Sequence, residues 1–288
     1  MTASPGRGAA SAPVINAPTQ RVRAAGADFV YRELGADSGD ALPLVALTHL
    51  GANLDSWDPE VVDPLAEDRR VLLIGYRGVG GSSGAAQQSF EAAADDVVAV
   101  IRALGVERVD LFGQSMGGMV AQAVLERAPQ LVDRVVLAGS GPRGGPGLVT
   151  MGGVMIRGIL RGVLTATDPI ALLFFTRTPN GRSAAKALAA RLTRRRVDRD
   201  SAVTLGVVRR QLGAVRRWGE EPPADSLFPH RALIVHGDGD RLVPPVNADL
   251  LRARFTDARL VVLPDSGHGV VPQNRRAVVD TVRSFLRR

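Results

Sequence analysis

Short apolar runs that alternate with amphipathic stretches restrict the fold of this chain more than any other feature. The runs PLVALTH (43–49), RVLLIG (70–75) and RVDLFG (108–113) are bounded by glycine or polar residues, as expected for buried parallel strands. Between the last two, residues 89–104 place apolar side chains at spacings of three and four, which predicts a helix capped by Ser89. The alternation indicates an α/β protein with a doubly wound, mostly parallel sheet.

This alternation is interrupted once. It stops near Gly141 and resumes at RALIVHGD (231–238), which is followed by a helix, another strand-like run and a terminal helix. The residues between have a helical composition and no convincing strand. Both ends of this insertion emerge at the carboxyl edge of the sheet. We therefore expect residues 21–141 and 226–288 to form the sheet domain, and residues 142–225 to form a helical cap over the strand ends.

The first 20 residues, MTASPGRGAASAPVINAPTQ, are rich in Ala, Ser, Pro and Gly and lack the apolar core of a secretory signal. We expect residues 1–20 to be a mobile arm. No apolar run approaches the ~20 residues of a membrane span, so we expect a soluble cytoplasmic protein with no membrane partner. The chain has no cysteine, which removes thiol catalysis and cysteine metal sites. Nucleophilic chemistry must therefore use an oxygen.

Positive charge is concentrated in the insertion. The formal net charge is +7, and residues 141–220 contain 15 basic residues against four acidic ones, including the run RLTRRRVDRD (191–200). Aromatic side chains that could stack on bases are almost absent there, so we expect no nucleic acid partner. We interpret the arginines mainly as a solvated face, with steering of an anionic substrate as the alternative. The apolar positions of the insertion recur at roughly helical spacing, and most are expected to pack on the sheet domain, with lining of a substrate pocket as the alternative: Met151, Met155, Ile156, Leu160, Leu172, Phe174 and Phe175.

The stretch DLFGQSMGGMV (110–120) places Ser115 in a Gly-x-Ser-x-Gly pattern. In the tight strand-to-helix turn known as a nucleophile elbow, only glycine fits two residues either side of the serine. An apolar run precedes Ser115 and a helical stretch follows it, as this turn requires. A serine nucleophile also needs a base and an acid. Two later loops offer both: HGDGDRLVPP (236–245) and PDSGHGV (264–270).

From Val22 to the C-terminus the chain resembles the α/β-hydrolase superfamily. The matching motifs are GQSMGG, GDGDRLVP, SGHG and THLGANLDSW, which occur in the family order, each after a predicted strand. The resemblance implies a serine-nucleophile enzyme of the esterase or cofactor-free haloperoxidase branch, with no cofactor and no metal. It implies Ser115 as the nucleophile and His268 as the base. Asp240 is the acid that matches the family motif, with Asp238 as the alternative.

Elimination among the four histidines also favours His268. His49 belongs to the loop after the third predicted strand, His230 precedes a strand, and His236 ends one. Only His268 is both late in the chain and flanked by glycine. Asp265, three residues before it, is interpreted as part of the supporting turn.

A tetrahedral oxyanion needs two backbone N–H donors. The resemblance implies that Met116, which follows the nucleophile at the start of a helix, is one of them. The other comes from the loop after the third predicted strand, where HLGA replaces the His-Gly-x of relatives. We expect Gly51 to be this donor, with Leu50 and Ala52 as alternatives.

The predicted function is hydrolysis of an ester-type bond in a small or medium organic substrate through an acyl-serine intermediate. C–C bond hydrolysis and cofactor-free perhydrolysis on the same residues are alternatives, as is a non-hydrolytic member of the fold that binds a ligand or catalyses a rearrangement. The glycine-rich run GVGGSSG (78–84) lacks the Gly-Lys-Ser/Thr ending of a phosphate-binding loop, so no cofactor is expected. No His, Asp and Glu residues have metal-ligand spacing. Nothing in the sequence indicates an oligomeric state.

Overall fold

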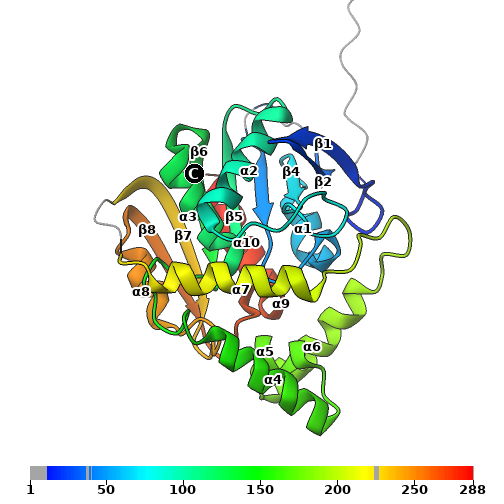
Figure 1. The fold of residues 1–288 in the computed structure, drawn as a ribbon, viewed down its shortest axis with the longest axis vertical. Coiled ribbons are helices and arrows are strands. Elements are labelled where there is room, and N and C mark those ends of the chain that lie inside the picture. The colour runs from blue at the N-terminus through cyan, green and yellow to red at the C-terminus, as the bar shows by residue number, and fades with distance from the viewer. Residues whose placement is uncertain (1–11, 37–38, 40, 224–226, 288) are drawn as a thin grey trace, which may run out of the picture.

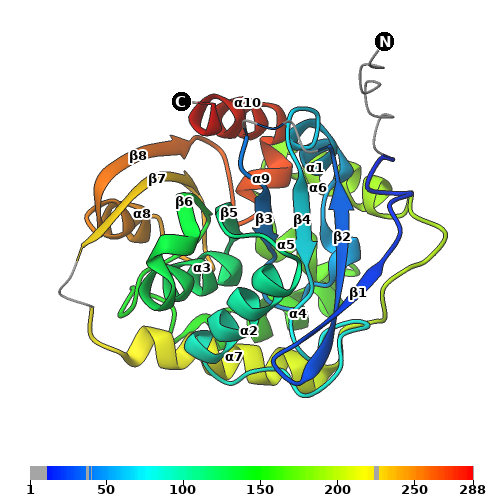
Figure 2. The same cartoon turned by 90° about the horizontal axis from the view of Figure 1, so that it is seen from above.

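A computed structural model of the chain describes residues 12–36, 39, 41–223 and 227–287, and its sheet has eight strands between layers of helices (Figures 1 and 2). The strand order is β1-β2-β4-β3-β5-β6-β7-β8; β2 pairs antiparallel with β1 and β4, and the other neighbours pair parallel. The predicted doubly wound, mostly parallel fold is confirmed. The strands are β1 (Gln20–Ala24), β2 (Ala27–Leu34), β3 (Leu44–Leu47), β4 (Val71–Ile74), β5 (Val109–Gln114), β6 (Val132–Ala138), β7 (Phe228–Gly237) and β8 (Phe255–Leu263).

Helices cover both faces of the sheet, and α4 to α7 are inserted between β6 and β7. Helices α2, α3 and α8 pack on one face, and α1, α9 and α10 pack on the other. The helices are α1 (Pro59–Leu65), α2 (Phe90–Ala103), α3 (Met116–Arg127), α4 (Met151–Thr165), α5 (Pro169–Phe174), α6 (Pro179–Leu192), α7 (Leu205–Glu220), α8 (Val246–Arg252), α9 (Val270–Gln273) and α10 (Arg275–Leu286), with short 3-10 turns η1 (Leu54–Ser56) and η2 (Pro129–Leu131).

Strand β3 illustrates why the parallel strands read as continuous apolar runs. Val45 and Leu47 pack with α2 and α3, whereas Leu44 and Ala46 face the layer of α1 and α10. All four residues are at most 2% exposed. The sheet therefore separates two apolar layers, which fix the strand ends from which the site loops emerge.

The segment before β1 differs from the expected mobile arm. Residues 1–11 lie outside the described residues. Further on, Val14 and Ala17 are buried, and the Arg195 guanidinium donates hydrogen bonds to the carbonyl oxygens of Val14 (2.8 Å) and Ala17 (3.0 Å). The expectation is therefore wrong for residues 12–19, because a distant arginine holds a segment whose own composition is typical of a loose chain.

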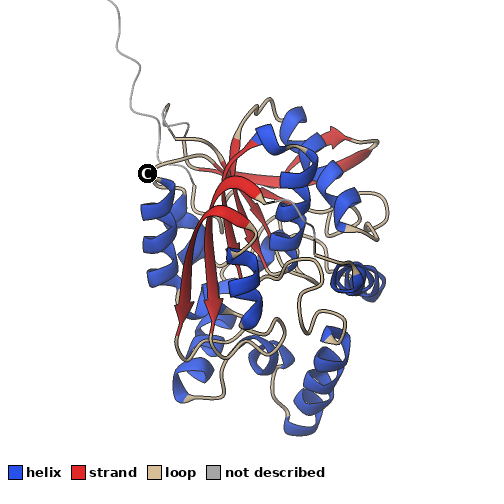
Figure 3. Ribbon diagram, turned by 90° about the vertical axis from the view of Figure 1, so that its left-hand side faces the viewer, coloured by secondary structure: helices blue, strands red, loops and turns tan. Residues whose placement is uncertain are grey.

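The inserted helices α4 and α5 lie at the end of the molecule toward which β7 and β8 point (Figures 1 and 3). Helix α7 runs across the middle of the molecule in Figure 1, and α4 and α5 pack together at its lower edge. No helix in the described part of the chain is both long and apolar enough to cross a membrane.

Two expectations for the insertion are wrong at particular residues. Ile156 and Leu160 of α4 are 60% and 57% exposed, so they neither pack on the sheet domain nor line an enclosed pocket. Arg191 and Arg195, by contrast, are buried. The arginines are buried because carboxylate and carbonyl partners surround them, as described below.

Candidate active site

Ser115 occupies a sharp turn between β5 and α3. Its backbone has φ 54° and ψ −119°, which residues other than glycine rarely adopt, and its N–H donates to the Ala138 carbonyl of neighbouring β6 (2.8 Å). A Cβ on Gly113 would lie 2.5 Å from the Gly117 carbonyl oxygen, and a Cβ on Gly117 would lie 2.1 Å from the Leu47 carbonyl oxygen. Close backbone approach therefore requires both glycines, and the turn carries the serine beyond the end of the sheet.

His268 connects Ser115 to a buried carboxylate. Its Nε2 lies 2.8 Å from Ser115 Oγ, and its Nδ1 lies 2.7 Å from Asp240 Oδ2. The three residues are at most 5% exposed, although they come from the loops after β5, β7 and β8. The structure thus brings the predicted nucleophile, base and acid into one hydrogen-bonded chain.

Several donors hold the Asp240 carboxylate in place. Its Oδ1 accepts hydrogen bonds from the N–H groups of Leu242 and Val243, both at 2.9 Å, and its Oδ2 also lies 3.4 Å from Nε2 of His236. Burial opposes ionisation, but the charges and hydrogen bonds of His268 and His236 hold the pKa of Asp240 well below its usual range. The carboxylate is therefore ionised near neutral pH and can keep the proton on Nδ1 of His268.

The other two acidic candidates make structural hydrogen bonds. Asp238 Oδ1 accepts from the Ser266 N–H at 3.1 Å, which ties the acid loop to the base loop. Asp265 Oδ2 accepts from Thr178 Oγ1 (2.9 Å) and from Asn180 Nδ2 (3.1 Å), at the start of α6. Asp265 therefore ties the base loop to an inserted helix.

A side chain of the insertion contacts one of the two predicted oxyanion donors. Met116 is the first residue of α3, and Gly51 lies in the loop after β3 with φ +72°. The Gly51 N–H donates to Oε1 of Gln211 in α7 at 2.9 Å. Gln211 is 5% exposed and, together with Met116, lines a cavity of about 20 Å³. Helix α7 therefore supplies an acceptor to the N–H that is predicted to stabilise the oxyanion.

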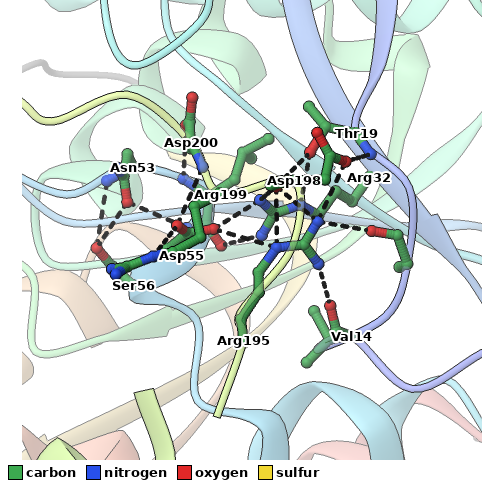
Figure 4. Close-up of polar contacts among 12 residues, drawn as sticks. Val14, Thr19, Arg32, Asn53, Asp55, Ser56, Arg195, Asp198, Arg199 and Asp200 are labelled. Carbon is green, nitrogen blue, oxygen red and sulfur yellow. Dashed lines mark hydrogen bonds and ion pairs between the residues drawn. The ribbon is translucent and has the colours of Figure 1, made fainter. Parts of the chain in front are cut away.

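The loop after β3 is fastened to the segment that precedes α7 (Figure 4). Asp200 Oδ2 accepts from the Leu54 N–H (3.2 Å), and the Asp200 N–H donates to Asp55 Oδ2 (3.0 Å). Asn53 Nδ2 donates to the Ser201 carbonyl (2.9 Å). The position of this loop therefore depends on the insertion as well as on the sheet.

Two arginines of the insertion are buried beside this loop. Arg195 Nε lies 3.6 Å from Asp55 Oδ1, which also binds Arg32 Nη2 at 2.6 Å (Figure 4). Burial and the neighbouring charge of Arg32 lower the pKa of Arg195. Arg191 makes a two-point contact with Asp58, at 2.8 and 2.7 Å, and both residues are under 5% exposed. These contacts anchor the inserted helices to the site loops.

A cavity of about 100 Å³ lies between the inserted helices and the site loops. The Phe174 ring of α5, which lines this cavity, lies 5.0 Å from the His49 ring and 5.1 Å from the His268 ring, edge-on to both. No group of three or more His, Asp or Glu side chains within the described ranges is arranged to hold a metal ion. The apolar lining residues of the cavity are Trp57, Val61, Ile170, Phe174, Leu188, Leu192, Val271 and Pro272.

Sequence reasoning misses two residues of this site. His236 is assigned only to a strand end, yet its Nε2 lies 3.4 Å from Asp240 Oδ2. The available signal is a histidine four residues before the acid, at the end of the strand from which the acid loop begins. Gln211 lies on the buried face of α7 with Val207, Ala214 and Trp218. A glutamine among apolar residues at helical spacing indicates a specific partner, although not which one.

Comparison with known proteins identifies the family. Residues 43–274 match the sequence profile of the family described as the alpha/beta hydrolase fold. The chain belongs to the α/β-hydrolase family. The resemblance drawn from the motifs is therefore confirmed, and the chain is an enzyme of the hydrolase class.

Relatives of this α/β-hydrolase include several hydrolases. A solved alpha/beta hydrolase fold protein from Chitinophaga pinensis is 28% identical with a TM-score of 0.90, over 96% of this chain and 99% of that one. A 2-hydroxymuconate semialdehyde hydrolase from a Pseudomonas species is 28% identical over 258 residues, 87% of this chain and 88% of that one. A pimeloyl-(acyl-carrier protein) methyl ester esterase from Pectobacterium carotovorum is 26% identical over 265 residues, 90% and 98% of the two chains.

Proposed function

We propose that this α/β-hydrolase cleaves an ester-type bond of a small or medium organic substrate through an acyl-serine intermediate. The observation that carries the proposal is the pair of short contacts that His268 makes, 2.7 Å to Asp240 and 2.8 Å to Ser115. An ionised Asp240 keeps the proton on Nδ1, which leaves Nε2 free to accept the serine proton.

The reaction has two halves. Ser115 Oγ attacks the carbonyl carbon while Nε2 of His268 takes the hydroxyl proton, and the N–H groups of Met116 and Gly51 stabilise the oxyanion. The imidazolium then gives its proton to the departing alcohol oxygen, and Ser115 remains acylated. A water molecule that loses a proton to the same Nε2 attacks the acyl carbon, and release of the acid regenerates the serine.

In this proposal residues 142–225 act as a cap on a core formed by residues 21–141 and 226–288. Contacts of Phe174 with the base and of Gln211 with Gly51 support this division. The cavity of about 100 Å³ is small beside the ~300–1,000 Å³ of common ligand pockets, which favours a short acyl group. The hydrogen bond between Gln211 and Gly51 has to open when the oxyanion forms.

Turnover of a short p-nitrophenyl ester tests this function. The Ser115→Ala variant should lose turnover by about 10³-fold or more, because it removes the hydroxyl oxygen that lies 2.8 Å from Nε2 of His268. Ser140→Ala is a matched control and should leave turnover unchanged. Ser140 is also buried, and it lies beside Gly118, which is three residues after Ser115. Equal turnover by wild type and Ser115→Ala would remove the proposed nucleophile.

Hydrolysis of a C–C bond is the second candidate. It is favoured by the similarity to the 2-hydroxymuconate semialdehyde hydrolase over 88% of the length of that protein. The same three residues could serve either bond. A panel that compares esters of several chain lengths, that semialdehyde and a peracid assay decides among ester, C–C and perhydrolase chemistry by the ratio of kcat/KM values.

A further inference from the structure

Helix α4 presents its large apolar side chains to solvent. Ile156, Ile159, Leu160, Val163 and Leu164 are between 45% and 85% exposed. Their spacing of three and four residues puts them on one face of the helix. A contiguous exposed apolar face of this kind marks a binding surface, whereas single exposed apolar residues are ordinary.

The opposite face of α4 holds the helix to α5. A Cβ on Gly158 would lie 2.3 Å from Leu173 Cδ2, and a Cβ on Gly162 would lie 2.7 Å from the Thr167 carbonyl oxygen and 3.0 Å from Pro169 Cγ. Helix α4 therefore packs through its small residues, and its outer apolar face is not needed to hold the pair together. The two helices lie at the outer end of the molecule, where a flat partner can reach them (Figures 1 and 3).

Arginines beside this face have no carboxylate partner. They line a groove of about 600 Å³ between α4 and α5, and among the described residues none of them forms an ion pair. Arg241 is held by the carbonyl oxygens of Leu172 (2.7 Å) and Phe175 (3.1 Å). From residue 134 to 197 the sequence has one acidic residue, Asp168, whose carboxylate caps α5. The groove combines the arginines with apolar side chains: Arg157, Arg161, Arg177, Arg241, Leu160, Leu164, Leu172 and Leu173.

We propose that the outer face of α4 and α5 docks on a membrane surface rich in anionic lipid. The apolar residues would enter the boundary between headgroups and acyl chains, and Arg157, Arg161 and Arg177 would contact the headgroup phosphates. Helix α4 has 15 residues, so it would lie in the interface and not cross it. This proposal departs from the sequence-based expectation of no membrane partner, and it assigns a use to the positive charge of the insertion.

A second copy of this chain fits the same face less well. In a two-fold interface each patch meets its own copy, so the arginines of one subunit would face those of the other. The patch supplies no free carboxylate to offset that repulsion, because Asp168 is occupied as a helix cap. An anionic lipid surface provides both the negative charge and the apolar layer.

Co-sedimentation of the full chain with lipid vesicles tests the proposal. We expect binding to vesicles of phosphatidylcholine mixed with phosphatidylglycerol and little binding to phosphatidylcholine alone. Val163→Ser with Leu164→Ser should weaken binding about tenfold, and so should Arg157→Glu with Arg161→Glu. Both pairs are exposed, so folding should be retained, which circular dichroism checks.

The matched control is Arg209→Glu with Arg210→Glu, two exposed residues of α7 that change the net charge by the same amount. It should keep binding; an equal loss would mean that overall charge drives binding, and the proposal would be wrong. Equal binding to both vesicle types, or binding to neither, also overturns it. A third result would also overturn it: the wild type is a dimer in light scattering and does not bind vesicles, and Val163→Ser with Leu164→Ser is a monomer. Ser115→Ala should bind vesicles like wild type, which separates this test from that of the proposed reaction.

Discussion

The sheet domain buries apolar side chains, whereas the inserted helices bury some of their charged side chains and expose some of their large apolar ones. The residues of β3 are at most 2% exposed and purely apolar, whereas in the insertion Arg191 is 3% exposed and Leu164 is 85% exposed. The sheet is held by apolar burial from both layers. The inserted helices are held at a few points by directed polar contacts, such as the two hydrogen bonds between Arg191 and Asp58. Because a few polar contacts hold the inserted helices in place, the apolar face of α4 can remain exposed for binding to something else.

The largest expected effect is a loss of kcat from a change in the sheet domain. Asp240→Asn should leave the fold intact and lower kcat for a p-nitrophenyl ester by about 10³- to 10⁴-fold, because an amide favours the wrong tautomer of His268. Asp238→Asn is the control with the same chemistry. Its carboxylate accepts from the Ser266 N–H, so its effect should be small. A reversed ranking would contradict the assignment of the acid.

The next effect tests the polar anchor of the insertion. Arg191→Met should lower the free energy of unfolding by about 3 kcal/mol, because it leaves Asp58 buried without its partner. Urea denaturation measures this. Arg194→Met is the control: its side chain is 52% exposed and 3.7 Å from Glu60, so the change should stay within about 0.5 kcal/mol. Equal changes in the two variants would show that the insertion is not anchored at Arg191.

The pH dependence of stability measures how well the insertion covers the site. Burial, opposed in part by a hydrogen bond to the Leu50 carbonyl, lowers the pKa of His49 to about 4. Between about pH 6.5 and 4 the unfolded chain therefore binds the extra proton, and stability should fall by about 1–2 kcal/mol as the pH drops through this window, since the ring keeps some solvent contact. Phe174→Ala, which uncovers the ring, should weaken this dependence. His49→Gln should remove the contribution of His49 and leave that of Asp110, whose pKa burial raises to about 6 and which acts in the opposite direction. An unchanged dependence in His49→Gln would contradict this origin.

The smallest effect concerns the contact between α7 and the loop after β3. Gln211→Leu frees the Gly51 N–H from a competing hydrogen bond worth about 1 kcal/mol, so kcat/KM for a small ester should rise by up to about fivefold. Hydrogen exchange of the Gly51 amide should become faster in the same variant. Val208→Ala removes packing next to Gly51 but no hydrogen bond, and should change neither. A fall in kcat/KM for Gln211→Leu would mean that this side chain assists the reaction and does not compete with it.

The site residues on the loops of the sheet domain can be predicted from the sequence more completely than those on the inserted helices. Gly113 and Gly117 are required because backbone atoms approach them closely in the turn around Ser115. This requirement is local, so the spacing of the two glycines from the serine is enough to predict it. Whether Arg195 or Leu164 faces inward depends on partners far along the chain, such as the carbonyl of Val14. Helical periodicity separates the faces of a helix but does not say which face is covered, and here a glycine face of α4 takes the contact with α5.

The place of the insertion in the sheet affects how the chain can vary. Strands β6 and β7 pair directly, with Arg134 opposite Arg231 and Ala138 opposite Val235, although roughly 90 residues separate the two strands. Loop-closure entropy grows only with the logarithm of length, so this excursion costs about 2–3 kcal/mol more than a connection of about five residues. A twofold change in the length of the connecting segment would change this loop-closure free energy by less than about 1 kcal/mol. The pairing of β6 with β7 therefore depends little on the segment that connects them, and substrate preference can diverge while strand pairing stays the same.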